Sequence, residues 1–320
     1  MKTVLVTGAA GRIGSLLCAT LSRKGYAIRA FVQKEGSVSG KNVTEFEGDI
    51  LDVGSIKAAA KEVDAVVHLA AIIDSSAPKN ILFDVNVQGT KNVLAAAPNK
   101  CKFVYASSVS IYGRSLPPIA NENTPAKPST LYGTSKYLAE AAALCAADRL
   151  QIASLQLGVV YGKGFEEGYF AVFKRLQKGK MKIIGDGENK IPFVHVQDVV
   201  DAIVLALERK TPSKIYLIVG EQKTQKELLE MAAKELGVQP PNAHIAKDTA
   251  YTLAKVNDFF SKIAGKKTSL NFDAIEMVSS HRAFDTSRAQ KELGWKAKVK
   301  LRDGVREMVR EYLLKSGKSG

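Results

Sequence analysis

Short apolar runs alternate with amphipathic segments along the first half of the chain. The apolar runs have the length and composition of buried strands, and the segments between them repeat their apolar residues at helical spacing. Strands are predicted at 4–6, 27–32, 43–47, 65–69, 102–107 and 152–157, and helices at 12–24, 55–61, 81–97 and 132–149. Because strands that alternate with helices are joined by right-handed crossovers, this order predicts an α/β fold with a doubly wound parallel sheet.

The pattern changes after Leu157. Glycine-bounded loops and helical patterns replace the regular alternation, and a capping box at Thr224 and Glu227 opens a helix that ends near Gly237. Further elements are predicted as helices at 169–177 and 198–208, a strand at 215–219, and helices around short connections from 246 to 314.

These two patterns predict two domains. Residues 1–160 form the sheet domain, and residues 161–320 form a smaller, mostly helical domain. Segments such as 191–220 are expected to pack back on the sheet domain. A site between the two parts is expected, since doubly wound sheets bind their ligands beyond the carboxyl ends of the strands.

The composition is that of an ordinary globular protein, and it narrows the function classes. No apolar run reaches the roughly 20 residues that span a bilayer, and residues 3–6 already read as a strand, so neither a membrane partner nor a signal peptide is expected. Cys18, Cys101 and Cys145 lie in apolar segments without metal-ligand spacing. They are interpreted as reduced core thiols, which favours a cytoplasmic location and no metal site.

The net charge of +14 is the one unusual global feature. A nucleic-acid partner would explain it, but the basic residues are spread along the chain, as on a lysine-rich solvated surface. Such a surface also favours an anionic cofactor and a small anionic substrate. No nucleic-acid partner is predicted.

Gly8, Gly11 and Gly14 stand where the first strand turns into the first helix. Glycines at this junction let the backbone approach a pyrophosphate, whose charge the helix N-terminus stabilises. The spacing is one residue looser than the common dinucleotide fingerprint, and a plain tight turn would also explain it. The position in a strand–helix–strand pattern favours a dinucleotide.

The end of the second predicted strand bears on which dinucleotide binds. Val32 stands where an acid would hydrogen-bond the ribose of NAD, while Arg12 and Lys34 are available to a 2′-phosphate. NADP is therefore favoured over NAD. Asp49 follows the third strand and is either an acceptor for the adenine amino group or a simple turn residue.

Tyr132 and Lys136 stand four residues apart at the start of an alanine-rich helix, and Ser108 follows the strand at 102–107. A phenol is a poor base at neutral pH, and an ammonium one helical turn away favours its ionised form. Ser108 would hold the substrate oxygen beside the phenol. An exposed helix face would explain the Tyr/Lys pair alone, but the three residues together with the glycine turn indicate hydride transfer from a nicotinamide.

Eight motifs give the chain a strong resemblance to the extended short-chain dehydrogenase/reductases, the NAD-dependent epimerase/dehydratase family. They lie at 7–14, 48–50, 68–71, 86–90, 107–113, 132–136, 193–199 and 285–295. The resemblance implies a Rossmann fold and a homodimer made by the helices at 81–97 and 132–149. It also implies that Ser110 neighbours the substrate and that His195 and Asp198 are structural.

The catalytic residues implied by the resemblance are the Ser108, Tyr132 and Lys136 already derived. The cofactor contacts implied or derived are Gly8, Gly11, Arg12, Ile13, Gly14, Lys34, Asp49, Ile50, Leu69, Ala70, Ala71, Asn86, Tyr132, Lys136, Leu157 and Val159.

Departures from the family pattern bear on the substrate. Gln156 and Ile191 stand where nucleotide-sugar epimerases usually carry arginines, and Val109–Ser110 replaces the acid pair of the sugar dehydratases. The run at 270–284 is more similar to the branch of dihydroflavonol reductases and 3β-hydroxysteroid dehydrogenases. The leading hypothesis is an NADP-dependent oxidoreductase acting on a secondary alcohol or carbonyl.

Two alternatives stay open. The first is a nucleotide-sugar 4-epimerase with tightly bound NAD, in which Arg282, Lys163 or Lys190 would meet a diphosphate. The second is an NADP-sensing binding protein without turnover, although such proteins often lack the tyrosine or the lysine that this chain retains.

Overall fold

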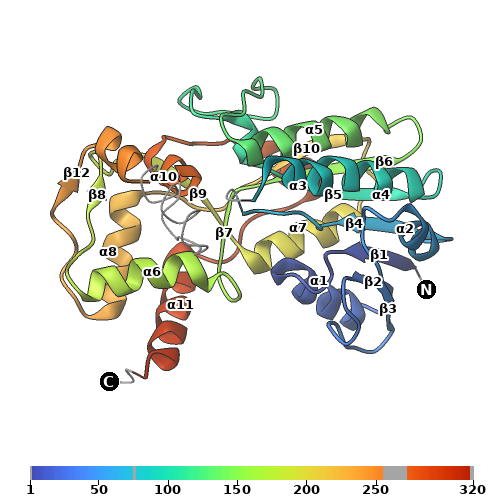
Figure 1. Cartoon of the computed structure of the whole chain (residues 1–320), viewed down its shortest axis with the longest axis horizontal. Helices are drawn as coiled ribbons and strands as arrows, with labels where there is room; N and C mark the ends of the chain where they lie inside the picture. The colour runs from blue at the N-terminus through green and yellow to red at the C-terminus, as the bar shows by residue number, and fades with distance from the viewer. Residues whose placement is uncertain (1, 75–76, 255–271, 318–320) are drawn as a thin grey trace.

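A seven-stranded parallel sheet forms the centre of the computed structural model, which describes residues 2–74, 77–254 and 272–317. The strand order is β10-β6-β5-β4-β1-β2-β3, which confirms the predicted doubly wound Rossmann topology (Figure 1). The strands are β1 Thr3–Thr7, β2 Ala27–Val32, β3 Val43–Glu47, β4 Ala65–His68, β5 Lys102–Ser108, β6 Gln151–Leu157 and β10 Lys214–Ile218.

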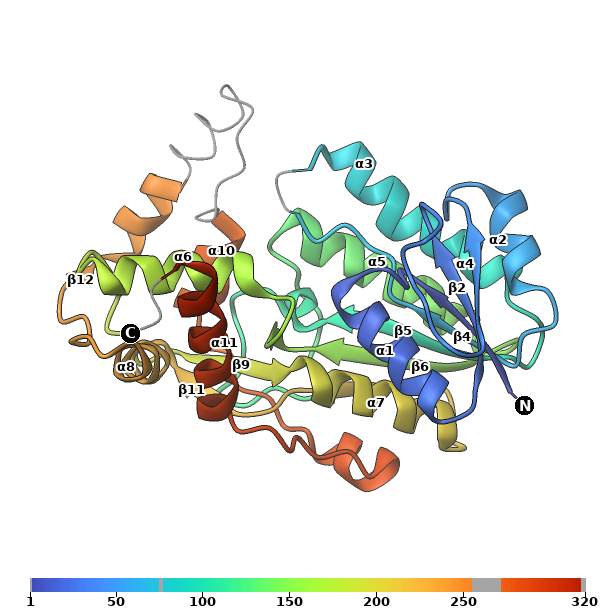
Figure 2. The same ribbon diagram turned by 90° about the horizontal axis from the view of Figure 1, so that it is seen from below.

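Helices cover both faces of this sheet (Figures 1 and 2). One face carries α1 Arg12–Arg23 and α7 Val196–Glu208, and the other carries α2 Val53–Ala60, α4 Thr90–Ala96 and α5 Leu131–Cys145. Every residue of β4 is buried, as expected of a strand covered on both faces. Two hydrophobic cores result, one on each side of the sheet.

The helix predicted at 81–97 differs from the observed structure. It is divided into α3 Lys79–Phe83, a π-helical turn η1 Asp84–Gly89, and α4. The periodicity of the side chains does not show the wide turn, because a π-turn adds one residue without changing which residues are apolar. The wide turn places Asn86, whose side chain contacts the loop after β4.

A second part of the molecule lies beyond the carboxyl ends of the main strands (Figure 1). Its helices are α6 Glu166–Gln177, α8 Gln225–Leu236, α10 Phe272–Ser279 and α11 Leu301–Lys315, with a helical stretch at 247–254 and a π-turn η3 Ala289–Leu293. Its strands are β7 Val159–Tyr161, β9 Lys190–His195 and β11 Gln222–Thr224 in one sheet, and β8 Ile183–Ile184 with β12 His244–Ile245 in another.

Caps and long-range hydrogen bonds fix this second part. The capping box of Thr224 and Glu227 begins α8, and Gly237 ends it in the left-handed conformation. The Asp198 carboxylate at the start of α7 accepts hydrogen bonds from the backbone N–H groups of Lys298 and Val299, 2.9 and 3.2 Å away. Asp198 therefore ties the C-terminal segment to the helix that packs on the main sheet.

The prediction of three core thiols is wrong for one of them. Cys18 and Cys101 are buried, but Cys145 is exposed, because it is the last residue of α5 and lies on the helix face that points away from the core. No helix in the described ranges is long and apolar enough to cross a bilayer. Residues 270–271, which begin the C-terminal run compared with the reductase branch, lie outside the described residues.

Candidate active site

The turn from β1 into α1 has no room for side chains at two of its glycines. Gly8 has φ +68°, and a Cβ there would lie 2.8 Å from the backbone nitrogen of Ala70. A Cβ on Gly14 would lie 2.1 Å from the carbonyl oxygen of Gly8. Gly11 is the N-cap, and α1 has neither a side-chain cap nor an acid in its first turn. The exposed N–H groups and the positive end of the helix dipole suit a pyrophosphate.

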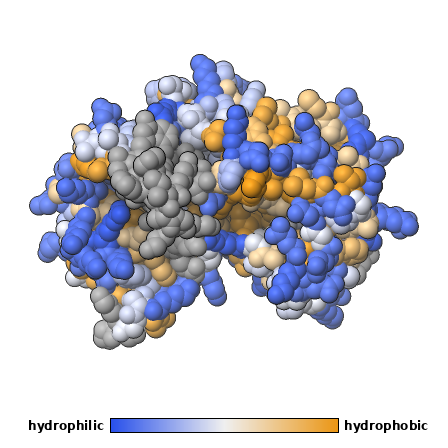
Figure 3. All heavy atoms as spheres, in the orientation of Figure 1, coloured by the Kyte–Doolittle hydropathy of each residue, from blue (hydrophilic) through white to orange (hydrophobic). Residues whose placement is uncertain are grey.

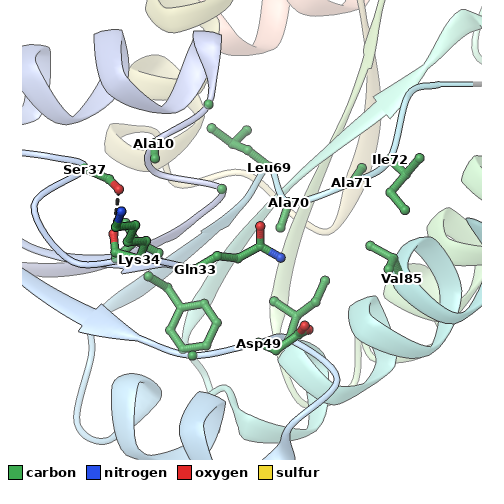
Figure 4. A pocket seen from close by; sticks show the side chains of 16 residues that line it. Ala10, Gln33, Lys34, Ser37, Asp49, Leu69, Ala70, Ala71, Ile72 and Val85 are labelled. Carbon is green, nitrogen blue, oxygen red and sulfur yellow. Dashed lines mark hydrogen bonds between the residues drawn. The ribbon is translucent and has the colours of Figure 1, made fainter. Parts of the chain in front are cut away.

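A cavity of about 560 Å³ extends from this turn across the ends of β2 and β3 (Figure 4). It is lined by the glycine turn, the loop after β2, the Asp49 turn and the loop after β4. One oxygen of Asp49 accepts a hydrogen bond from Leu51 N at 2.9 Å, so Asp49 is both a turn residue and part of the wall. The predicted residues that line it are Gly8, Gly11, Lys34, Asp49, Ile50, Leu69, Ala70 and Ala71.

A second cavity of about 500 Å³ continues from the first toward the second part of the molecule. The two share Gly8, Gly11, Leu69 and Ala71, so they form one groove along the carboxyl ends of the strands. The predicted residues that line the second cavity are Gly8, Gly11, Arg12, Ile13, Gly14, Leu69, Ala71, Ser108, Tyr132, Lys136, Leu157 and Val159. Sequence reasoning missed Ile73, Val160, Phe165 and Met277, which also line it.

Helix α5 brings Tyr132 next to Ser108. The Thr130 side chain caps the helix by accepting a hydrogen bond from Gly133 N at 3.0 Å. A Cβ on Gly133 would lie 2.6 Å from the carbonyl oxygen of Ser110, so this glycine lets the helix approach the short 3-10 helix η2 Val109–Tyr112 that follows Ser108. The hydroxyl groups of Ser108 and Tyr132 thereby meet at the carboxyl end of β5.

Burial is the largest cause of the pKa shifts of Tyr132 and Lys136. Burial raises the pKa of Tyr132 to about 12, although a hydrogen bond with Ser108 lowers it. Burial lowers the pKa of Lys136 to about 7, although the Glu140 carboxylate raises it. The Lys136 Nζ lies 4.3 Å from the ring centroid of Tyr105, which solvates the ammonium in place of water. Because its pKa is raised to about 12, Tyr132 holds its proton at neutral pH.

Asn86 is the one predicted cofactor contact that lines neither cavity. Its Oδ1 accepts from Ile72 N at 2.7 Å, and its Nδ2 donates to the Ile72 carbonyl and to Ser135 Oγ at 2.9 and 3.0 Å. These bonds fasten the loop after β4 to α5. Asn86 thus supports the loop that forms part of the groove wall but does not line the groove itself.

Arg12 and Lys34, expected together at a 2′-phosphate, lie in different parts of the groove. Lys34 lines the first cavity beside Ser37 (Figure 4). The Arg12 guanidinium lines the second cavity and lies 5.3 Å from the ring centroid of Phe165. The structure therefore brings one of the two cations to the end of β2, where the ribose of a dinucleotide would lie.

The cations considered for a substrate diphosphate do not line the groove. Arg282 is buried, with Nη2 3.5 Å from a Glu276 oxygen and Nη1 3.5 Å from the carbonyl oxygen of Val109. Lys163 and Lys190 are exposed. None of the three belongs to either cavity wall.

His68 at the end of β4 is buried between two hydroxyl groups. Its Nδ1 lies 2.6 Å from Thr7 Oγ1, and its Nε2 lies 2.9 Å from Thr90 Oγ1. Burial and, as the smaller cause, the Lys136 charge lower the pKa of His68 from 6.5 to about 3. The ring is neutral in the folded protein and joins β1, β4 and α4.

We expect His68 to make the fold sensitive to acid. The unfolded chain binds a proton on His68 below its ordinary pKa of 6.5, whereas the folded chain does so only near 3. The neutral ring contributes its full share to the free energy of unfolding above pH 6.5. As the pH falls from 6.5 toward 3, this free energy decreases by about 1.4 kcal/mol for each pH unit. Unfolding free energies measured across this range should fall less steeply in His68→Gln than in the wild type. His244→Gln, on an exposed histidine, is the control; equal slopes in all three would contradict the prediction.

The NAD dependent epimerase/dehydratase family matches residues 4–219, more than half of the chain. The chain belongs to this family. The match confirms the resemblance to the extended short-chain dehydrogenase/reductases, and it makes the protein an enzyme of the reductase or epimerase type with a nicotinamide cofactor.

Three similar proteins show the range of this family. A 2-alkyl-3-oxoalkanoate reductase of Stenotrophomonas maltophilia is 26% identical to this chain, and the match covers 95% of this chain and 98% of the reductase. The N-acetyl-alpha-D-glucosaminyl-diphospho-ditrans,octacis-undecaprenol 4-epimerase of Escherichia coli O157:H7 is 28% identical over 94% of this chain and 92% of its own. The solved structure of MoeE5 with UDP-glucose and NAD has a TM-score of 0.77 and 27% identity, and the match covers 98% of this chain and 99% of that chain.

Proposed function

We propose that the protein is an NADP-dependent oxidoreductase that interconverts a secondary alcohol and a carbonyl compound. The bound nicotinamide supplies and accepts the hydride. Tyr132 donates a proton to the carbonyl oxygen in reduction, and Ser108 holds that oxygen. Lys136 provides a positive charge beside the phenol and binds the cofactor ribose. The observation that carries the proposal is that Ser108, Tyr132 and Lys136 line the same cavity as the glycine turn.

The wall of the second cavity favours an apolar substrate. Ile73, Val160, Phe165 and Met277 supply apolar side chains to this wall. Arg12 and Lys136 are its only cations among the described residues. A nucleotide sugar would leave its diphosphate without the paired arginines that bind such groups well. The Stenotrophomonas relative is named a 2-alkyl-3-oxoalkanoate reductase, and such a substrate carries apolar alkyl chains beside its ketone and carboxylate.

A 4-epimerase is the second candidate, favoured by the similarity to the Escherichia coli epimerase. The two candidates differ in how they use the cofactor. Mass spectrometry of the denatured protein should find NADP in exchangeable form for a reductase and tightly held NAD for an epimerase. Incubation with substrate but without added cofactor separates them further, because an epimerase turns over and a reductase stops. Cofactor binding without turnover of any carbonyl compound or nucleotide sugar would support the binding protein.

We expect the protein to bind NADPH about tenfold more tightly than NADH, since a bond between an ammonium and a phosphate contributes about 1.5 kcal/mol. Lys34 supports the preference because it lies at the end of β2, and Val32 there offers no acceptor to a ribose hydroxyl. Fluorescence titration of Lys34→Met should give nearly equal dissociation constants for the two. Arg12→Met should keep the preference, because Arg12 lies beside Phe165. Equal constants in the wild type would refute the argument.

We also propose that the protein is a homodimer. Leu131, Tyr137 and Leu138 on α5 and Ile81 on α3 are exposed, and hydrophobic residues gather over these helices (Figure 3). A two-fold axis beside α5 would bury this surface against its own copy. Light scattering should give a dimer for the wild type and a monomer for Leu138→Glu. Leu314→Glu, on the exposed leucine of α11, should stay dimeric. A monomeric wild type would exclude the dimer.

A further inference from the structure

A buried carboxylate lies one helical turn beyond the catalytic lysine. Tyr132, Lys136 and Glu140 follow one another at intervals of four on α5, so their side chains share one face of the helix. Glu140 has 4% of its surface exposed, and it lines neither cavity of the groove. No step of the proposed reaction needs a carboxylate at this position.

The hydrogen-bond partners of Glu140 are neutral. Its Oε2 accepts from Ser154 Oγ at 2.6 Å, and its Oε1 accepts from Gln156 Nε2 at 3.0 Å. Gln156 Oε1 in turn accepts from the Tyr112 hydroxyl at 2.7 Å. Among the described residues no cation forms an ion pair with Glu140. A buried carboxylate with neutral partners is costly unless a positive charge lies nearby.

The ammonium of Lys136 is likewise a buried charge, and most of its titratable neighbours are neutral. The titratable groups that face it are Tyr132 and Glu140 on its own helix, Tyr105 on β5 and His68 on β4. The two phenols are neutral at neutral pH because burial raises the pKa of each, and His68 is neutral as well. Glu140 is therefore the one negative charge among these described groups.

We propose that Glu140 is a positioning residue that acts through Lys136, holding it as a charged ammonium although its side chain is buried. The value of this ammonium for turnover rests on the proposed function. Its value for dinucleotide binding does not rest on the proposed function. Lys136 lines the groove, and the chain belongs to a family that binds a nicotinamide dinucleotide. The effect of Glu140 on the pKa of Lys136 agrees with this proposal. Burial lowers that pKa, and the Glu140 charge opposes the shift.

The pH dependence of NADPH binding tests the proposal. Glu140→Gln keeps the shape of the side chain and removes its charge, so Lys136 should lose its proton at lower pH. We expect the pH at which NADPH affinity declines to move down by about one unit or more, in fluorescence titrations from about pH 5 to 9. An unchanged midpoint would overturn the proposal.

Two variants serve as matched controls. Ser154→Ala removes a hydrogen bond from the same carboxylate but leaves its charge, so it should lower the melting temperature without moving the midpoint. Glu140→Asp keeps the charge and should restore a midpoint near that of the wild type. A midpoint that moves equally in Ser154→Ala and Glu140→Gln would show a merely structural role and would count against the proposal.

A rescue experiment covers the case in which Glu140→Gln does not fold. Removing the carboxylate leaves the Lys136 ammonium buried without its counter-charge. The double variant Lys136→Met/Glu140→Gln has neither charge, so it should fold and melt at a higher temperature than Glu140→Gln alone. A double variant as unstable as the single one would overturn the proposal. This readout needs neither a substrate nor turnover, so it stays decisive even if no carbonyl compound is ever reduced.

Discussion

Tyr132→Phe should lower kcat by about 10²–10⁴-fold while the dissociation constant for NADPH stays within about twofold of the wild type. Phenylalanine fills the same space on α5 but has no proton to give. The loss falls on turnover because the phenol acts on the substrate oxygen, whereas the glycine turn and Lys136 still hold the dinucleotide. Initial rates with a carbonyl substrate of the wild type, followed by NADPH oxidation, and fluorescence titration of NADPH measure the two effects separately.

The same substitution at Tyr312 is the matched control. Tyr312 is a buried residue of α11 whose hydroxyl donates to Gln177 at 2.9 Å, and it lines neither cavity. Tyr312→Phe should leave kcat unchanged. If Tyr132→Phe retained the wild-type kcat, Tyr132 would not be the proton donor, and the proposed mechanism would have to be abandoned. A joint loss of kcat and dinucleotide affinity would instead indicate that the site had collapsed.

The sequence predicts the main sheet well because its signals are local. β2 and β3 have the predicted bounds, since β2 is mainly apolar and β3 contains the β-branched and aromatic residues Val43, Thr44 and Phe46 beside two glutamates. The glycine turn can also be predicted from the sequence. The positions of its glycines just after the first strand indicate a close approach of the backbone to a ligand. Tyr132 and Lys136 are readable because their spacing alone puts them on one helix face.

Features set by contacts between distant segments could not be predicted in this way. The sequence offers Arg12 and Lys34 as equivalent cations, but packing against Phe165 takes Arg12 to the other cavity. The carboxylate of Glu276 joins nearby Arg282 to Arg114 and Ser129, two residues far from it along the chain. Such pairings depend on which loops the fold brings together, and no spacing in the sequence encodes them.

The relative positions of Ser108 and Tyr132 depend on contacts with α10. Glu276 on α10 accepts hydrogen bonds from Arg114, which follows η2, and from Ser129, which precedes the cap of α5. Met277, the next residue, lines the second cavity. One carboxylate of the second part of the molecule thus contacts the two segments that carry Ser108 and Tyr132. The wall of the second cavity and the hydroxyl groups of Ser108 and Tyr132 are therefore held as one unit.

Gly14→Ala should weaken NADPH binding by about 10–100-fold. The added Cβ would lie 2.1 Å from the carbonyl oxygen of Gly8, so the turn must move by about 1 Å to reach an ordinary contact. The atom it meets is backbone, which cannot rotate away as a side chain can. Overpacking of this kind costs about 1–3 kcal/mol, and each 1.4 kcal/mol withheld from binding is about tenfold in affinity.

Gly168→Ala separates this steric effect from the general effect of adding a methyl group. Gly168 is a helical residue of α6 with open space where a Cβ would be, so alanine there should preserve NADPH affinity and slightly raise the melting temperature. Isothermal titration with NADPH and thermal unfolding would be measured on both variants. Wild-type affinity in Gly14→Ala would mean that the dinucleotide does not lie against this turn. In that case the glycine turn would only pack α1 against β1, and the position assigned to the cofactor would be wrong.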